Sequence, residues 1–206
     1  MDDKLNAIML KSAAMFQEYG IRSISMDDIC REMGISKKTI YQYFDNKTDL
    51  IKKLLDHISY AHEDEKTKLR EMNLNAIDVL LEVSKHISRN IKKFNPSVTF
   101  DLKKYYPEIF KEFIEKKHGV LFEDIKENLE QGIKEGFYRE NLNVDLIARL
   151  YVKKIEDIHD SEYWKCEDIS FEMVFEVVFE SHIRAISNIK GVEYFEKQKQ
   201  TINFNI

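Results

Sequence analysis

The sequence predicts an all-α protein with a small N-terminal domain of three helices and a larger helical C-terminal domain. Its 206 residues include only 2 prolines and 6 glycines, so few turns are expected. Apolar residues recur at helical spacing along most of the chain, polar residues suited to capping precede these stretches, and no strand pattern competes with them. We place the two domains at residues 1–46 and 47–206, with a continuous connection between them.

The first helix is expected over residues 4–19 and ends at Gly20. The next helix follows Ser25, because Ser25 and Asp28 have the spacing of a capping box with aspartate in place of glutamate. Gly34 can adopt the left-handed conformation that ends this second helix. Apolar side chains lie on one face of the first helix, at Leu5, Ile8, Met9, Ala13 and Phe16.

A third short helix is predicted over Lys37–Phe44, with Ser36 as its N-cap, and Asn46 with Asp49 caps the helix after it. Two short helices joined by a tight glycine turn form a helix-turn-helix, whose second helix enters the DNA major groove. Lysine and threonine donate to base acceptors and phosphate oxygens, and tyrosine hydroxyls reach the backbone. We expect base contacts from Lys37, Lys38 and Tyr41, and phosphate contacts from Ser25, Thr39, Tyr43 and Lys47.

The run G-I-S-K-K-T-I-Y-Q-Y-F-D-N-K-T-D-L, from Gly34 to Leu50, resembles the signature of the TetR family of bacterial transcriptional repressors. Upstream, A-A-M-F-Q-E-Y-G-I-R-S-I-S-M-D-D-I also matches the first helix and turn of that family. Lys38 stands where the family often has a small residue. The close resemblance covers about the first quarter of the chain. It implies a homodimeric repressor that binds double-stranded operator DNA at a palindrome and is released by a small-molecule effector.

Charge alone does not indicate a DNA-binding protein. Residues 1–56 contain nine Lys and Arg and nine Asp and Glu, so the N-terminal domain is neutral, and the net charge of -5 comes from the remainder. Positive charge is local, because residues 36–53 contain five lysines and only two acidic residues. A nucleic-acid binder is usually recognised by a basic face, and here only this short segment supplies one.

The larger domain is expected to consist of long helices over about residues 47–72, 75–94, 107–135, 144–160 and 170–189, with a short helix opened by Pro96. The tail after Gly191 shows no clear periodicity. Aromatic residues are dense between residues 97 and 122, where they either line a ligand cavity or fill an ordinary helical core. The resemblance favours a ligand site here, made by Phe100, Tyr105, Tyr106, Phe110, Phe113 and Phe122, with His86 and Asp101 as polar contacts.

The last two long helices have the dimerisation role in the TetR family. A stripe of apolar residues on them packs either against a twofold-related copy, giving a four-helix interface, or inside the protomer's own core. The residues of this predicted dimer interface are Val178, Phe179, Ile183 and Ile186.

Other function classes find little support. An enzyme is not expected, because no nucleophile elbow, glycine-rich phosphate loop or zinc-protease motif is present. A helical enzyme without a motif and a protein-interaction scaffold without DNA binding stay open as alternatives. The lysine-tyrosine surface from Lys37 to Lys47 argues against the scaffold, because a protein-binding surface would be more apolar.

No cofactor and no metal site are expected. The residues Asp157, His159, Asp160, Glu162 and Cys166 are of metal-binding types but have no defined spacing. No apolar run approaches the ~20 residues that a membrane span needs, and the charged N-terminus is not a secretory signal. We expect a cytoplasmic protein with no membrane partner, in which Cys30 is a buried free thiol.

Overall fold

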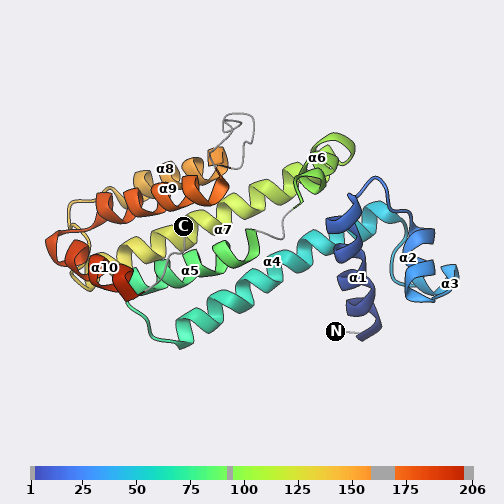
Figure 1. Cartoon of the computed structure of the whole chain (residues 1–206), viewed down its shortest axis with the longest axis horizontal. Helices are drawn as coiled ribbons and strands as arrows, with labels where there is room; N and C mark the ends of the chain where they lie inside the picture. The colour runs from blue at the N-terminus through green and yellow to red at the C-terminus, as the bar shows by residue number, and fades with distance from the viewer. Residues whose placement is uncertain (1–2, 92–94, 159–169, 202–206) are drawn as a thin grey trace. The chain divides into compact units, whose positions relative to one another are not determined.

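The computed structural model describes residues 3–91, 95–158 and 170–201, and these residues form ten helices and no strand (Figure 1). The predicted all-α fold is therefore confirmed. No helix in this part of the chain has the length and apolar character that crossing a membrane requires. The helices are α1 Asp3–Tyr19, α2 Met26–Met33, α3 Lys37–Ile40, α4 Lys47–Glu71, α5 Ala76–Ile91, α6 Pro96–Tyr105, α7 Pro107–Lys134, α8 Val144–Ile158, α9 Phe171–Ile186 and α10 Ile189–Thr201.

The helices form two compact units. The first unit holds α1, α2, α3, α6, most of α4 and the start of α7 as far as Lys117; the second unit holds the rest. Helix α6 thus belongs with the N-terminal helices, although it lies beyond residue 46. The predicted domain boundary after residue 46 stays a prediction.

The core of the first unit is built by the apolar faces that the helical spacing predicted. Ile8 and Phe16 of α1 meet Ile29 of α2 and Leu50 of α4, and Leu102 of α6 joins the same cluster. These side chains are at most 5% exposed. Burial of one large apolar side chain contributes ~1.5–3 kcal/mol, so this cluster holds the short helices in place.

The predicted helix starts are confirmed. Asn75 Oδ1 accepts from the N–H groups of Ile77 and Asp78 at the start of α5. Asn95 caps α6 with Pro96 in the first turn, and Asn143 Oδ1 accepts from the N–H of Leu146 at the start of α8. These caps satisfy amide groups that a helix cannot pair internally.

Helix α3 is shorter than predicted. It ends at Ile40 rather than Phe44, and residues 41–43 form a turn. The N–H of Gln42 bonds to Thr39 O at 3.2 Å and that of Tyr43 to Ile40 O at 3.1 Å, which is the tighter three-residue bonding of a 3₁₀ turn. This turn still carries Phe44 into the core, where it is 1% exposed.

The second unit is a bundle in which α5, α8 and α10 each contact α9, and α7 runs alongside them (Figure 1). Its core includes Leu129 of α7, Ile183 of α9 and Phe195 of α10. Tyr138, in the loop after α7, is fully buried and donates a hydrogen bond of 3.1 Å to Asn128 Oδ1.

The C-terminal helices differ from the prediction. The expected helix 170–189 ends at Ile186, and the tail that showed no period forms α10. Ser187 pairs with Tyr138 in an isolated antiparallel bridge, and the N–H of Asn188 bonds to Phe137 O at 3.0 Å. Asn188 Oδ1 then accepts from the N–H of Gly191, so Asn188 caps a new helix. The break between α9 and α10 thus coincides with a contact to the loop after α7.

Candidate nucleic-acid interface

Helices α2 and α3 form the predicted helix-turn-helix. Gly34 has a φ of 63°, the left-handed conformation that ends α2. Ser36 Oγ then accepts from the N–H of Thr39 at 3.1 Å and starts α3, and its oxygen lies 2.9 Å from Thr39 Oγ1. Ile40 is fully buried, which fixes the rotation of α3 about its own axis.

This rotation determines which side chains α3 presents to solvent. Lys37 and Lys38 are exposed, and Tyr41, just after α3, is 49% exposed. Thr39 and Tyr43 are half-buried. The exposed surface of the second helix is therefore made of two lysines and a tyrosine, which are donors suited to base acceptors and phosphate oxygens.

Four of the five lysines between residues 36 and 53 have partners inside the protein. Only Lys38 makes no hydrogen bond or ion pair with another residue that the structure describes. Most of the local positive charge is therefore paired, which the count of residues did not reveal. The four paired contacts are Lys37 Nζ to Asp27 Oδ2 at 2.6 Å, Lys47 Nζ to Ile21 O at 2.5 Å, Lys52 Nζ to Glu112 Oε2 at 3.2 Å and Lys53 Nζ to Tyr43 O at 2.8 Å.

Lys47, predicted to hold a phosphate, is half-buried at the start of α4. Its ammonium bonds to the carbonyl of Ile21 and lies 5.7 Å from the ring centroid of Phe16. Burial lowers the pKa of Lys47, and the carboxylates of Asp101 and Asp28 oppose that change. In this structure the Lys47 side chain holds the segment between α1 and α2, and its contact with phosphate stays a prediction.

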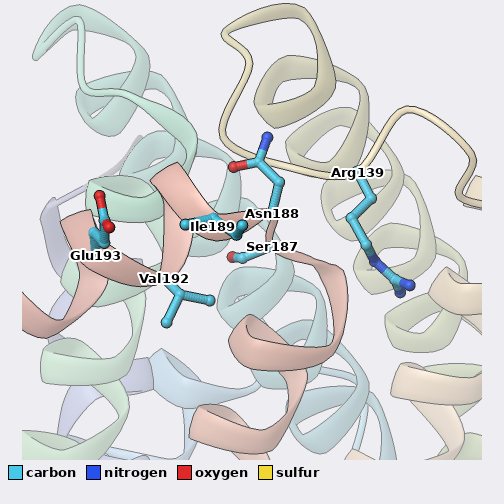
Figure 2. A pocket seen from close by; sticks show the side chains of 6 residues that line it. All are labelled: Arg139, Ser187, Asn188, Ile189, Val192 and Glu193. Carbon is cyan, nitrogen blue, oxygen red and sulfur yellow. The ribbon is translucent and has the colours of Figure 1, made fainter.

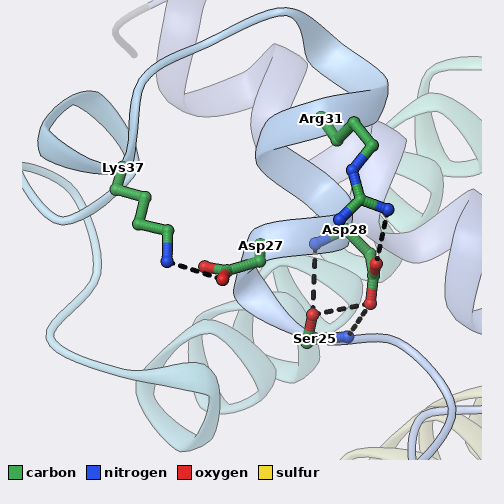
Figure 3. Close-up of polar contacts among 5 residues, drawn as sticks. All are labelled: Ser25, Asp27, Asp28, Arg31 and Lys37. Carbon is green, nitrogen blue, oxygen red and sulfur yellow. Dashed lines mark hydrogen bonds and ion pairs between the residues drawn. The ribbon is translucent and has the colours of Figure 1, made fainter.

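Ser25, also predicted to meet phosphate, forms the reciprocal capping box of α2 (Figure 3). Its Oγ accepts from the N–H of Asp28 at 3.1 Å and lies 2.6 Å from Asp28 Oδ2, which also accepts from the N–H of Ser25. These hydrogen bonds hold the pKa of Asp28 below its usual value. Arg31 adds an ion pair to Asp28 at 3.4 Å, and sequence reasoning did not identify this contact.

Helix α6 contacts the α1–α2 turn, residues 20–25. Asp101, which is 8% exposed, accepts a hydrogen bond of 2.7 Å from the backbone N–H of Arg22. The Arg22 guanidinium donates to Tyr105 Oη at 2.5 Å and lies 4.8 Å from the centroid of the same ring. Asp101 and Tyr105 were predicted as ligand contacts; their polar atoms here hold the segment that leads into the helix-turn-helix.

A second connection joins the start of α6 to the end of α1. The N–H of Asn95 donates to Gln17 Oε1 at 3.1 Å, and Asn95 Nδ2 donates to Gln17 O at 2.8 Å. Both ends of α6 are therefore hydrogen-bonded to the N-terminal segment, the start to the end of α1 and the end to the α1–α2 turn. The residues involved are 78 to 83 positions apart, so no local sequence signal could have revealed these pairs.

The remaining predicted ligand residues are divided between the two units. Phe100 is 57% exposed, and Tyr106 and Phe110 pack on the core of the first unit. Phe113 borders a small space of about 20 Å³ with Ile109. His86 and Phe122 belong to the second unit. Ligand binding by this set stays a prediction.

A separate open hollow of about 480 Å³ lies in the second unit, where α10 begins (Figure 2). None of the predicted ligand residues lines it. Two of its lining residues, Ile189 and Val192, are apolar and the other four are polar or charged, and the hollow is open to solvent rather than enclosed. Its lining residues are Arg139, Ser187, Asn188, Ile189, Val192 and Glu193.

The predicted dimer residues lie mostly in the core of the second unit. Phe179, Ile183 and Ile186 are at most 4% exposed, and Val178 is half-buried. The spacing identified an apolar face of α9 that packs against the protomer's own core, and a role of these residues in a dimer stays a prediction. Among the described side chains of α8 and α9, the large exposed apolar ones are Leu146 and Leu150 of α8 and Met173 and Val177 of α9.

Among the described residues, no group of three or more His, Cys, Asp or Glu side chains is arranged to hold a metal ion. Of the five metal-type residues singled out in the sequence, Asp157 lies in α8, and His159, Asp160, Glu162 and Cys166 lie outside the described residues. Cys30 is buried as a free thiol, and burial raises its pKa.

Comparison with known proteins gives matches to transcriptional regulators. A sequence model of the bacterial regulatory proteins of the tetR family matches residues 8–54. An uncharacterised HTH-type transcriptional regulator of Bacillus subtilis is 22% identical over 160 residues, which is 76% of this chain and 81% of that protein. An HTH-type transcriptional regulator of Staphylococcus aureus is 30% identical over 107 residues, covering 47% of this chain and 57% of that protein.

Solved structures share the fold over nearly the whole chain. A transcriptional regulator from Cytophaga hutchinsonii superposes with a TM-score of 0.73 at 20% identity, covering 91% of this chain and all of that one. A regulator of the TetR family from Agrobacterium tumefaciens superposes with a TM-score of 0.69 at 17% identity, covering 90% of this chain and 98% of that one. A regulator from Saccharomonospora viridis, solved in complex with choline, superposes with a TM-score of 0.73 at 14% identity. The match covers 91% of this chain and all of that one.

Proposed function

Because this chain belongs to the TetR family of bacterial transcriptional regulators, we propose that it is a cytoplasmic repressor that binds a palindromic operator as a homodimer and leaves it when a small molecule binds. The observation that carries the proposal is the exposed surface of α3. A buried Ile40 turns two lysines and Tyr41 outward from the second helix of a helix-turn-helix. In such units the start of this helix reaches base edges.

On DNA, Lys38 and Tyr41 would contact base edges, because both are exposed and Lys38 has no internal partner among the described residues. The first-turn amides of α4, which begins at Lys47, would receive a phosphate, since a helix N-terminus favours an anion. Ser25, Thr39 and Tyr43 flank this surface as further phosphate contacts. The Lys47 ammonium would contribute by holding the α1–α2 turn through Ile21.

For the dimer, we propose the exposed apolar face of α8 and α9 as the contact surface. Leu146 and Leu150 lie one turn apart on α8, and Met173 and Val177 lie one turn apart on α9. The buried Phe179 and Ile183 would support this face from behind. A twofold dimer of this kind reads two half-sites that lie about one helical turn, ~34–36 Å, apart or somewhat more.

For the switch, α6 offers a direct route to the DNA-binding helices. A ligand that displaces α6 would pull on the Arg22–Asp101 and Gln17–Asn95 hydrogen bonds. A displacement of α4 would act on the same DNA-binding helices, α2 and α3. The first turn of α4 is proposed to meet DNA, and its later residues belong to both units. A coupling of ~1–3 kcal/mol, or about 5–150-fold in affinity, is typical of such switches. The choline complex of the Saccharomonospora viridis regulator supports a ligand in this fold, without indicating which ligand this chain takes.

The proposal is tested by a footprint and a gel-shift assay on the DNA that flanks the protein's own gene. We expect one protected palindrome, bound by a dimer and competed poorly by unrelated duplex. Once a ligand is found, its affinity with and without saturating operator should differ by the same factor as the operator affinity with and without ligand. Equal ligand affinities would remove the switch and leave a DNA-binding dimer. Absence of any salt-dependent DNA binding would favour the helical enzyme or the scaffold.

A further inference from the structure

Two aspartates stand side by side in the first turn of α2, and they have different partners (Figure 3). Asp28 is occupied by the capping box with Ser25 and by Arg31. Asp27 takes no part in the cap. Its Oδ2 instead lies 2.6 Å from the Nζ of Lys37, the first residue of α3. This ion pair joins the start of one helix of the DNA-binding motif to the start of the other.

The Asp27 carboxylate lies in the first turn of α2, at the positive end of the helix dipole. Asp27 in turn raises the pKa of Lys37, which therefore keeps its proton. The side chains are 66% and 48% exposed for Lys37 and Asp27, so a phosphate could compete for the lysine.

The pair changes how much free positive charge the motif offers to DNA. With Lys37 held by Asp27, Lys38 is the one lysine of residues 36–53 that has no hydrogen bond or ion pair within the described part of the chain. Moving Lys37 to a phosphate would leave the Asp27 carboxylate unpaired next to a polyanion. This electrostatic repulsion between Asp27 and DNA applies to every DNA sequence, because phosphates carry no sequence information.

We propose that Asp27 is a specificity-determining residue of the DNA interface: it withholds the Lys37 ammonium from phosphate and leaves recognition to Lys38 and Tyr41. The inference rests on the proposed DNA-binding function and concerns the same surface. Non-specific binding depends almost wholly on phosphate contacts, whereas operator binding adds base contacts that fix the register of α3. In the fixed register Lys37 stays on Asp27. In the loosely docked non-specific complexes, Lys37 would bind phosphate if Asp27 did not hold it. Asp27 therefore lowers the affinity for non-specific DNA more than it lowers the affinity for the operator.

The test compares Asp27→Asn with the native protein on two probes, a short duplex of arbitrary sequence and the DNA flanking the protein's own gene. Affinity is measured by fluorescence anisotropy over a series of salt concentrations. One added phosphate contact steepens the salt dependence by about 0.9 and tightens binding by roughly eightfold at ~0.1 M salt. We expect this change on the arbitrary duplex, a smaller one on the flanking DNA, and hence a lower specificity ratio.

Glu32→Gln is the matched control. It removes the same charge from the same helix, but it frees Lys11 of α1, which pairs with Glu32 at 2.7 Å, rather than a residue of α3. We expect its salt dependence to match that of the native protein. If Glu32→Gln strengthened binding to the arbitrary duplex as much as Asp27→Asn, general charge rather than release of Lys37 would be responsible, and the inference would be overturned.

The double variant Asp27→Asn with Lys37→Gln separates release of the lysine from every other effect of Asp27. Without the lysine, the substitution of Asp27 has nothing to release, so the double variant should return to the native salt dependence. A double variant that kept the steeper dependence would overturn the inference. So would an Asp27→Asn protein, folded by circular dichroism, that binds the arbitrary duplex no more tightly than the native protein, while the proposed function would stand. Native protein that bound neither probe would overturn the proposed function itself.

Discussion

The carboxylate of Asp101 on α6 accepts a hydrogen bond of 2.7 Å from the backbone N–H of Arg22, 79 residues earlier in the chain. Asp101 is 8% exposed, and its Oδ2 would lie 3.3 Å from a Cβ added at Gly20. The segment between α1 and α2 is thus packed against α6 at the point where it turns toward the helix-turn-helix. This contact therefore links α6 to the segment that leads into the helix-turn-helix.

Replacing Asp101 by alanine should leave the Arg22 N–H without its acceptor. Because an unsatisfied, partly buried donor costs ~1–3 kcal/mol, the free energy of unfolding in urea should fall by about that amount. Asp101→Asn keeps an acceptor oxygen in the same place and should cost less. If the asparagine and alanine variants were equally destabilised, the carboxylate would matter through its charge rather than through this hydrogen bond.

Two glycines of α7 give a matched pair. A Cβ at Gly132 would lie 2.1 Å from the ring of the fully buried Tyr138, so Gly132→Ala should force this ring to move and cost ~1–3 kcal/mol or more. No atom lies within 4 Å of a Cβ at Gly119, so Gly119→Ala should stabilise the helix by roughly 1 kcal/mol. Thermal unfolding of the two variants should therefore shift in opposite directions. If both variants were stabilised, the loop that holds Tyr138 would move at little cost in free energy.

His182 should make stability depend on pH. It is buried and stacked on Tyr151 with ring centroids 3.6 Å apart, and burial together with the Lys154 charge lowers its pKa from 6.5 to about 4. Between these values the unfolded chain binds more protons than the folded chain, so stability falls as the pH falls from about 6.5 to 4. The contribution of His182 to this loss is on the order of 3 kcal/mol.

His182→Phe keeps an aromatic ring at the stack and removes the titration. Urea unfolding between pH 7 and 4 should therefore show a shallower loss of stability in this variant than in the native protein. Parallel pH dependences would show that His182 is protonated in the folded state at its ordinary pKa. Carboxylates affect both proteins alike, so the difference between them reports on His182.

A charge on the exposed face of α9 should separate the protomers. Val177 is 66% exposed, so Val177→Glu leaves the core of the protomer intact and places a carboxylate in the proposed dimer contact. Sedimentation should give a folded monomer with much weaker operator binding. Leu10→Glu, at a residue of α1 that is 64% exposed, is the control and should stay dimeric. A dimeric Val177→Glu protein would place the interface on another surface.

The sequence predicted the features that depend on neighbouring residues. Ser25 with Asp28, Gly34, Ser36 and Asn46 all act as the local signals indicated, because capping involves atoms only a few positions apart. The turn and the caps of the helix-turn-helix belong to this class, whereas α3 ends at Ile40 instead of the predicted Phe44.

Features that depend on distant contacts were missed or assigned differently. The N–H of Asn188, just before α10, meets Phe137 O, and Asp101 meets Arg22 across 79 positions. The stripe at Phe179 and Ile183 marked an apolar face of α9, but periodicity cannot tell whether such a face meets the protomer's own core or another chain. In the same way, a count of lysines could not show that Lys37 and Lys47 already have partners.

DNA binding through α3 is tested most directly by anisotropy titrations of the native protein and Lys38→Gln on the DNA flanking its own gene, over a series of salt concentrations. Lys68→Gln, at an exposed residue near the end of α4, is the control. We predict salt-dependent binding by the native protein and by Lys68→Gln, with Lys38→Gln weakened about 5–150-fold, which corresponds to the loss of a base contact worth ~1–3 kcal/mol. Equal affinities for Lys38→Gln and the native protein on this DNA would contradict recognition by α3.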